Sequence, residues 1–188
     1  MKKKIFVLAL IVMCLSIVAY GTLAFFSYED TATNVIVAGN VRITLHEWQK
    51  TESGELKPFD SPIDVLPGIA VSKIVQVENT GSSAAWVRIS VQKAIELAQG
   101  IPGETDPNLF DYDLNAEYWT ERNGYYYYNV AVQPGQTTQP LFTQVKFAAN
   151  MSNMYQQSKA ILTIHAQGVQ AANNGTTVFE AAGWPDAE

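Results

Sequence analysis

The residues best suited to chemistry in this chain are its two histidines. His46 and Glu47 begin like the HExxH motif of zinc proteases, in which two histidines on one helical face bind zinc. Lys50 stands where the second histidine is required, and the segment alternates like a strand. His165 lies on the polar side of another alternating run, which indicates an exposed structural histidine. Because no GxSxG motif is present either, we predict no catalytic residue, no metal site, no cofactor and no enzymatic activity.

Two neighbouring carboxylates are the next candidates. Asp111 and Asp113 flank a tyrosine, and clustered carboxylates are the ligands that calcium prefers. The central glycine and terminal glutamate of an EF-type loop are missing. The stretch 101–113 also carries two prolines and a glycine, so we interpret it as a solvated acidic surface loop.

The run Tyr125–Tyr128 is the most distinctive group of aromatic residues. In a strand, alternate side chains point to opposite faces, so one tyrosine pair is expected to join the core and the other to reach the surface. The exposed pair either stabilises the sheet through cross-strand contacts or forms a platform for a sugar or a protein. The predicted surface aromatic patch consists of Tyr125, Tyr127, Trp86 and Trp119.

The elements that must position these residues are strands. Apolar and polar residues alternate with a period of two at 41–46, 75–78, 87–92, 141–147 and 160–167. Turn residues separate the runs, and Asn123-Gly124 is the sharpest hairpin signal because both residues tolerate the positive φ of a type I′ turn. Helical signal is confined to one or two turns at 91–99. The sequence therefore predicts an all-β fold: an antiparallel jelly roll or β-sandwich with short helical turns and surface loops.

Charge is unevenly distributed along the 188 residues, which contain 12 basic and 18 acidic side chains. Three lysines open the chain and no acidic residue precedes Glu29, so residues 25–188 carry 12 − 3 = 9 basic and 18 acidic groups, a net charge of 9 − 18 = −9. No concentrated basic face is available to neutralise phosphates, which excludes a nucleic-acid partner. The single cysteine, Cys14, lies in the N-terminal apolar run, so residues 25–188 contain no disulfide.

Residues 1–24 have the three parts of an export signal: lysines, an apolar run and a stretch of small residues. Thr22 and Ala24 occupy the −3 and −1 positions of a cleavage site that releases Phe25 as the new N-terminus. The alternative is an uncleaved signal-anchor helix, which would be the only contact with a membrane. Residues 25–188 are predicted to form a single domain, and the adjacent Phe25 and Phe26 require burial.

Several motifs resemble the TasA–camelysin family of exported Gram-positive proteins. The most specific ones lie near the signal, and shorter ones follow in the body of the chain. They are Gly21-Thr22-Leu23-Ala24-Phe25-Phe26, Asp30-Thr31-Ala32-Thr33-Asn34, Ala38-Gly39-Asn40-Val41, Leu66-Pro67-Gly68, the stretch 73–81 and the closing stretch 162–174.

The resemblance implies a jelly-roll fold, processing by a signal peptidase of the SipW type, and a secreted subunit of biofilm-matrix fibres at the cell surface. In such fibres the N-terminal segment of one copy completes the sheet of the next, forming a head-to-tail homopolymer. Carried onto this chain, the donor strand is residues 25–37. Its apolar side chains are Phe25, Phe26, Val35, Ile36 and Val37.

The sequence is also compatible with two other functions. One is a monomeric cell-surface module that binds a carbohydrate or a protein through the tyrosine strand or the acidic loop. The other is a metalloprotease, as described for camelysin relatives, although no metal ligand of that kind can be assigned here.

Overall fold

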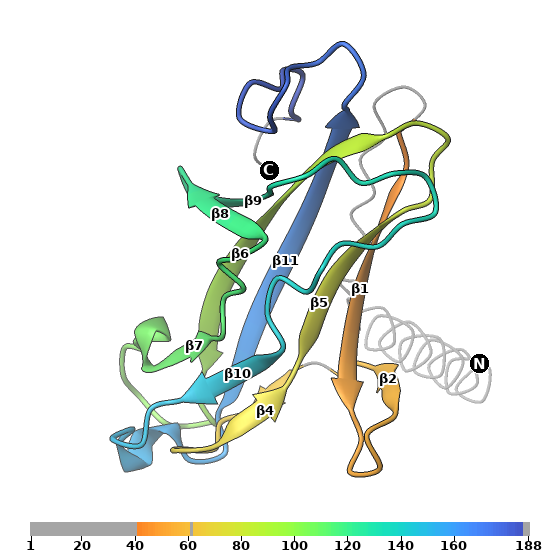
Figure 1. Ribbon diagram of the computed structural model, residues 1–188. Coiled ribbons are helices and arrows are strands. Elements are labelled where there is room, and N and C mark those ends of the chain that lie inside the picture. The colour runs from red at the N-terminus through yellow and green to blue at the C-terminus, as the bar shows by residue number, and fades with distance from the viewer. Residues whose placement is uncertain (1–40, 61, 186–188) are drawn as a thin grey trace, which may run out of the picture. The chain divides into compact units, whose positions relative to one another are not determined.

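Two long neighbouring strands, β6 (Ala85–Glu96) and β11 (Lys159–Gln170), form the centre of the fold and pair antiparallel along twelve residues (Figure 1). The structure is a computed structural model that describes residues 41–60 and 62–185. Both strands follow the alternating pattern of the sequence, with apolar side chains directed into the core.

These two strands belong to a five-stranded antiparallel sheet with the order β3-β11-β6-β9-β8. The short β3 (Ile63–Asp64) pairs with the beginning of β11, and β9 (Tyr125–Tyr128) pairs with β6. The outermost strand, β8 (Trp119–Arg122), pairs with β9. This sheet forms one layer of the fold.

The second layer is built from two three-stranded sheets. One has the order β2 (Leu56–Pro58), β1 (Ile43–Lys50) and β5 (Ile74–Asn79); the other has the order β4 (Ala70–Ser72), β10 (Gln144–Phe147) and β7 (Phe110–Tyr112). Lys73 joins β4 directly to β5, and residues 136–143 run beside β5 before entering β10. Main-chain hydrogen bonds such as Thr138 N–H to Val77 O (2.9 Å) and Leu141 N–H to Val75 O (2.8 Å) tie this segment to β5.

The hydrophobic core lies between the two layers. It contains apolar residues from both, including Val75 and Val77 of β5, Ile89 of β6, and Phe142, none of which is exposed to solvent. The largest fully buried side chain is that of Trp119. Its indole N–H donates to Gln139 O at 3.0 Å, which satisfies its one polar group. The predicted all-β antiparallel sandwich is therefore confirmed.

The hairpin predicted at Asn123-Gly124 is also confirmed. Asn123 has φ 54° and Gly124 has φ 78°, as a type I′ turn requires, and the turn joins β8 to β9 with Arg122 opposite Tyr125. The short helical turns are η1 (Pro107–Leu109) and η2 (Asn153–Tyr155).

Two local predictions are wrong. Residues 91–96 are not helical, because Ile95 and its neighbours continue β6 and pair with residues 159–161 of β11. The predicted loop at 101–113 contains the strand β7, in which Phe110 is 1% exposed. In both places the main chain finds hydrogen-bond partners on a distant strand, which local patterns do not reveal.

Candidate functional site

The open edge of β11 is the most distinctive feature that the fold offers for binding. In an antiparallel pair, opposite residues alternately exchange two main-chain hydrogen bonds or none. Just beyond β11, Ala171 N–H donates to Ala84 O at 2.9 Å and continues the β11–β6 register. The odd-numbered residues of β11 therefore bond to β6, and the even-numbered residues direct their N–H and C=O groups away from it.

The opposite side of β11 confirms this assignment. Val65 N–H donates to the even-numbered Ser158 O at 3.0 Å, and β3 pairs only with Lys159 and Ala160. Among residues 41–60 and 62–185, no strand pairs with this side of β11 after Ala160. The main-chain groups left facing outward belong to Leu162, Ile164, Ala166 and Gly168, whereas Gln170 O accepts a hydrogen bond from Asn174 Nδ2 at 2.9 Å.

A second open edge belongs to β1. Phe59 N–H donates to Glu47 O at 3.0 Å, so the odd-numbered residues of β1 face away from β5. On that side β2 pairs only with residues 48–50. Within the described part of the chain, the outward main-chain groups of Ile43 and Leu45 have no strand partner.

The last part of β11 and the start of β1 lie close together, at the upper end of both strands in Figure 1. A β-carbon placed on Gly168 of β11 would lie 3.1 Å from Cγ2 of Ile43 and 3.4 Å from Cγ1 of Val41. The missing side chain at Gly168 thus lets the start of β1 approach β11 closely. An extended chain entering here would meet, from both layers, main-chain groups that have no strand partner among the described residues.

Several other strand edges of the described chain are short and carry charged side chains, and the edge strand β4 has only three residues, all uncharged. β8 has four residues, including Glu121 and Arg122; β2 has three, including Lys57; and β7 has three, including Asp111. Short, charged edges discourage pairing with another chain. By contrast, residues 161–170 of β11 contain no lysine, arginine, aspartate or glutamate. The long β11 edge is therefore the one suited to accept a strand.

The residues predicted for export and donation lie outside the described residues. These are the cleavage-site residues Thr22, Ala24 and Phe25, and the donor residues Phe25, Phe26, Val35, Ile36 and Val37. No helix in the described part of the chain is long and apolar enough to cross a membrane.

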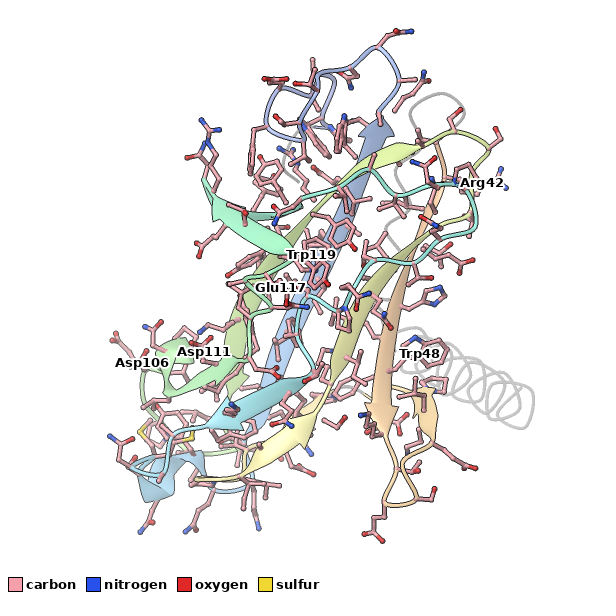
Figure 2. All side chains as sticks on the ribbon, viewed as in Figure 1. Arg42, Trp48, Asp106, Asp111, Glu117 and Trp119 are labelled. Carbon is pink, nitrogen blue, oxygen red and sulfur yellow. The ribbon has the colours of Figure 1, made fainter. Side chains whose placement is uncertain are left out.

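The predicted surface aromatic patch is not a surface patch. Trp119 is 1% exposed in the main core and contacts Tyr128, with ring centroids 5.0 Å apart (Figure 2). Trp86 and Tyr127 are 7% and 9% exposed, and Tyr125 is half-buried. The alternation of the tyrosines was predicted correctly, but both faces of β9 are covered.

The C-terminal segment 171–185 covers the outer face of β9. Val178, 1% exposed, packs against Trp86 and Tyr127, and the Trp86 indole N–H donates to Asn174 O at 3.0 Å. The sequence pattern shows which side of a strand is apolar, but not that a distant segment folds back over the polar side.

Arg88 of β6 binds the C-terminal segment 171–185 to the five-stranded sheet. Its guanidinium lies 3.8 Å from the ring centroid of Tyr125 and 4.7 Å from that of Trp184. It donates to Gln167 Oε1 at 2.7 Å and to Pro185 O at 3.0 Å. The cation is thus held between two aromatic rings and is 9% exposed.

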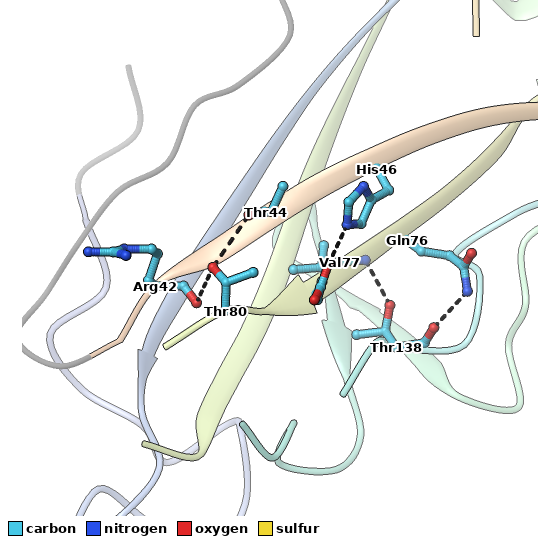
Figure 3. Close-up of polar contacts among 8 residues, drawn as sticks. Arg42, Thr44, His46, Gln76, Val77, Thr80 and Thr138 are labelled. Carbon is cyan, nitrogen blue, oxygen red and sulfur yellow. Dashed lines mark hydrogen bonds and ion pairs between the residues drawn. The ribbon is translucent and has the colours of Figure 1, made fainter. Parts of the chain in front are cut away.

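His46 is part of a polar pair on the outer face of β1 and β5 (Figure 3). Its Nε2 lies 2.8 Å from Glu78 Oε2, and its ring stacks on Trp48 with centroids 5.5 Å apart. His165 lies half-buried in β11. The described residues contain no group of three or more side chains placed to hold a metal ion.

Asp113 has a structural role. One of its carboxylate oxygens accepts the N–H groups of Thr143 (2.8 Å) and Gln144 (2.6 Å), and the other accepts the Thr143 hydroxyl (2.6 Å). Burial opposes ionisation, but these hydrogen bonds outweigh it and lower the pKa of Asp113. Asp111 lies in β7 (Figure 2) and forms an ion pair with Lys93 at 3.6 Å.

A buried ion pair was missed at the sequence level. Lys73 is 1% exposed, is paired with Glu47, and lies 3.7 Å from the centroid of the Phe59 ring. Burial lowers the Lys73 pKa, and the carboxylate of Glu47 partly opposes this effect. The sequence pattern could have revealed this burial, because strand alternation places Lys73 on the same side as the buried Val75 and Val77.

Comparisons with known proteins return no match: no family model, no curated protein and no solved structure is significantly similar to this chain.

Proposed function

We propose that this chain is an exported, non-enzymatic subunit of an extracellular fibre and that subunits join by strand addition. The open edge of β11 is the observation that carries the proposal. An incoming strand would satisfy the outward main-chain groups from Leu162 to Gly168, with each hydrogen bond contributing about 0.5–1.5 kcal/mol net. Strand addition to an exposed sheet edge is a general mode of protein recognition.

The proposed donor is residues 25–37 of a second copy. Its apolar residues Phe25, Phe26, Val35, Ile36 and Val37 follow the predicted cleavage site and precede the start of β1. Because the donating and accepting surfaces differ, each added copy leaves one of each exposed at the ends, and growth is head-to-tail. The motifs that resemble the TasA–camelysin family agree with this assembly, with export through a SipW-type peptidase, and with a place in a biofilm matrix.

The net charge of the chain implies that assembly depends on salt concentration. Residues 25–188 carry a net charge of 9 − 18 = −9, so copies repel one another at neutral pH. Salt screens this repulsion over a Debye length of about 10 Å at 0.1 M. We expect assembly to accelerate as salt is added.

The test compares two purified proteins, one beginning at Phe25 and one beginning at Ala38. We expect filaments by electron microscopy from the first and monomers from the second. If the shorter protein polymerises equally well, the donor assignment is wrong.

A peptide of residues 25–37 added to the shorter protein locates the acceptor. Hydrogen exchange should slow at the outward amides of Leu162, Ile164 and Ala166. The amides of Thr163 and His165 face β6 and serve as internal controls, since they are protected in both states. A peptide with the same composition in scrambled order is the matched control. Binding without added protection at the three outward amides would refute β11 as the acceptor.

A further inference from the structure

The chain contains two Asn-Gly steps, Asn123-Gly124 and Asn174-Gly175. At such a step the main-chain nitrogen of glycine can attack the side-chain amide carbon of asparagine, because glycine has no β-carbon to obstruct the approach. The local sequence is equally permissive at both steps. In the folded protein, however, the surroundings of the two steps differ in how far they permit this reaction.

The amide of Asn174 is fully engaged. Its Nδ2 donates to Gln170 O at 2.9 Å and to Ala182 O at 3.0 Å, and its Oδ1 accepts the Ala182 N–H at 2.8 Å. Gly175 is crowded as well: a β-carbon there would lie 2.8 Å from Cβ of Glu180. Rotating the Asn174 amide toward the Gly175 nitrogen would break three hydrogen bonds inside a packed segment.

Asn123 has the opposite environment. It is exposed at the tip of the β8–β9 hairpin, and within the described chain no hydrogen bond from its side chain is found. Nothing lies within 4 Å of the position that a β-carbon on Gly124 would occupy. Among the described strands β8 pairs with β9 alone, so the turn can open without disturbing a second neighbour.

We infer that Asn123 is a site of spontaneous deamidation and that the fold protects Asn174. The Gly124 nitrogen loses its proton and forms a bond to Cγ of Asn123, and ammonia leaves with that proton, giving a five-membered succinimide. Water then opens the ring at either carbonyl. The product is aspartate at 123 or isoaspartate, in which the main chain runs through the former side chain. No reactant other than water is consumed.

The isoaspartate product changes the hairpin. It adds one carbon to the main chain inside a two-residue turn whose geometry fixes the pairing of β8 with β9. That pairing places Trp119 opposite Tyr128, and both side chains lie in the core. Deamidation at Asn123 to isoaspartate therefore slowly and irreversibly weakens the pairing of β8 with β9.

The experiment ages the purified chain in mildly alkaline buffer and maps both steps by peptide mass spectrometry with isoaspartate detection. In the native protein we expect Asn174 to react roughly a hundredfold more slowly than Asn123, because freeing its amide breaks three hydrogen bonds that contribute about a factor of five each. In urea the two steps should react at similar rates, since only the fold distinguishes them.

The N123D variant is the matched control, because it adds the same charge without lengthening the main chain. We expect fresh N123D to unfold like fresh wild-type protein, and aged wild-type protein enriched in isoaspartate to unfold at lower urea. The inference is overturned if Asn174 reacts as fast as Asn123 in the native protein. It is equally overturned if native Asn123 stays unmodified while the urea sample deamidates.

Discussion

Replacing Gly168 by alanine tests the close contact between β1 and β11. The new β-carbon would lie 3.1 Å and 3.3 Å from two carbons of Ile43 and 3.4 Å from Val41. These neighbours are 1% and 0% exposed, and both are β-branched, so neither can move aside without disturbing the core. Gly168 does not have a positive φ, so no backbone strain contributes.

The expected change in the free energy of unfolding of G168A is the balance of two effects. Overfilling a packed core costs about 1–3 kcal/mol, whereas replacing a strand glycine by alanine recovers about 0.5–1 kcal/mol of chain entropy. The free energy of unfolding of G168A should therefore fall by up to about 2.5 kcal/mol relative to wild type.

Urea unfolding followed by tryptophan fluorescence measures this difference, with the m-value expected to stay constant. I43V is the partner variant, because it removes the Ile43 carbon that lies 3.3 Å from the new β-carbon. Alone it should cost about 0.5–1.5 kcal/mol; in the G168A background it should cost less. A more stable G168A, or a double-mutant cycle that is additive within about 0.5 kcal/mol, would refute the contact.

Three further predictions concern Trp119, the Lys73–Glu47 pair and Asp113. W119A should lower the free energy of unfolding by about 3–5 kcal/mol, measured by urea titration, whereas W119F should retain much of it. E47A leaves the Lys73 ammonium buried without its carboxylate and should cost about 3–5 kcal/mol; the double variant E47L/K73M should recover most of this loss, and no recovery would contradict the buried-pair assignment. Because the pKa of Asp113 is lowered in the fold, its stabilising effect is complete above the ordinary aspartate pKa and disappears as pH falls through the folded value. D113A should therefore be less stable than wild type at neutral pH and should approach it in acid, which thermal melts across pH would show.

The strand architecture was readable from the sequence because its cause is local. Alternation at Val87 and Ile89 reports which side of a strand meets the core, and Asn123-Gly124 supplies the positive φ that a two-residue hairpin needs. Residues 91–96 differ, because their weak helical preference yields to pairing with β11.

The tyrosine run also combines a feature set by local sequence with one set by distant contacts. Alternation alone separates Tyr125 and Tyr127 from Tyr126 and Tyr128, as found. Sequence could not reveal that Val178 and Trp184 return from the chain's end to cover the first pair, or that Trp119 turns inward. Contacts between residues this far apart depend on the final arrangement of the layers.

The sequence by itself determined the strand period, the hairpin turn, the acidity of residues 25–188 and the absence of cysteine there. Only the tertiary structure decided which edges stay open, because an edge is defined by the neighbour that a strand lacks. β3 ends its pairing at Ala160 and β2 begins its pairing at Trp48, which leaves the rest of these edges of β11 and β1 without a strand partner in the described chain. The same arrangement engages the amide of Asn174 and leaves that of Asn123 exposed, although both precede a glycine.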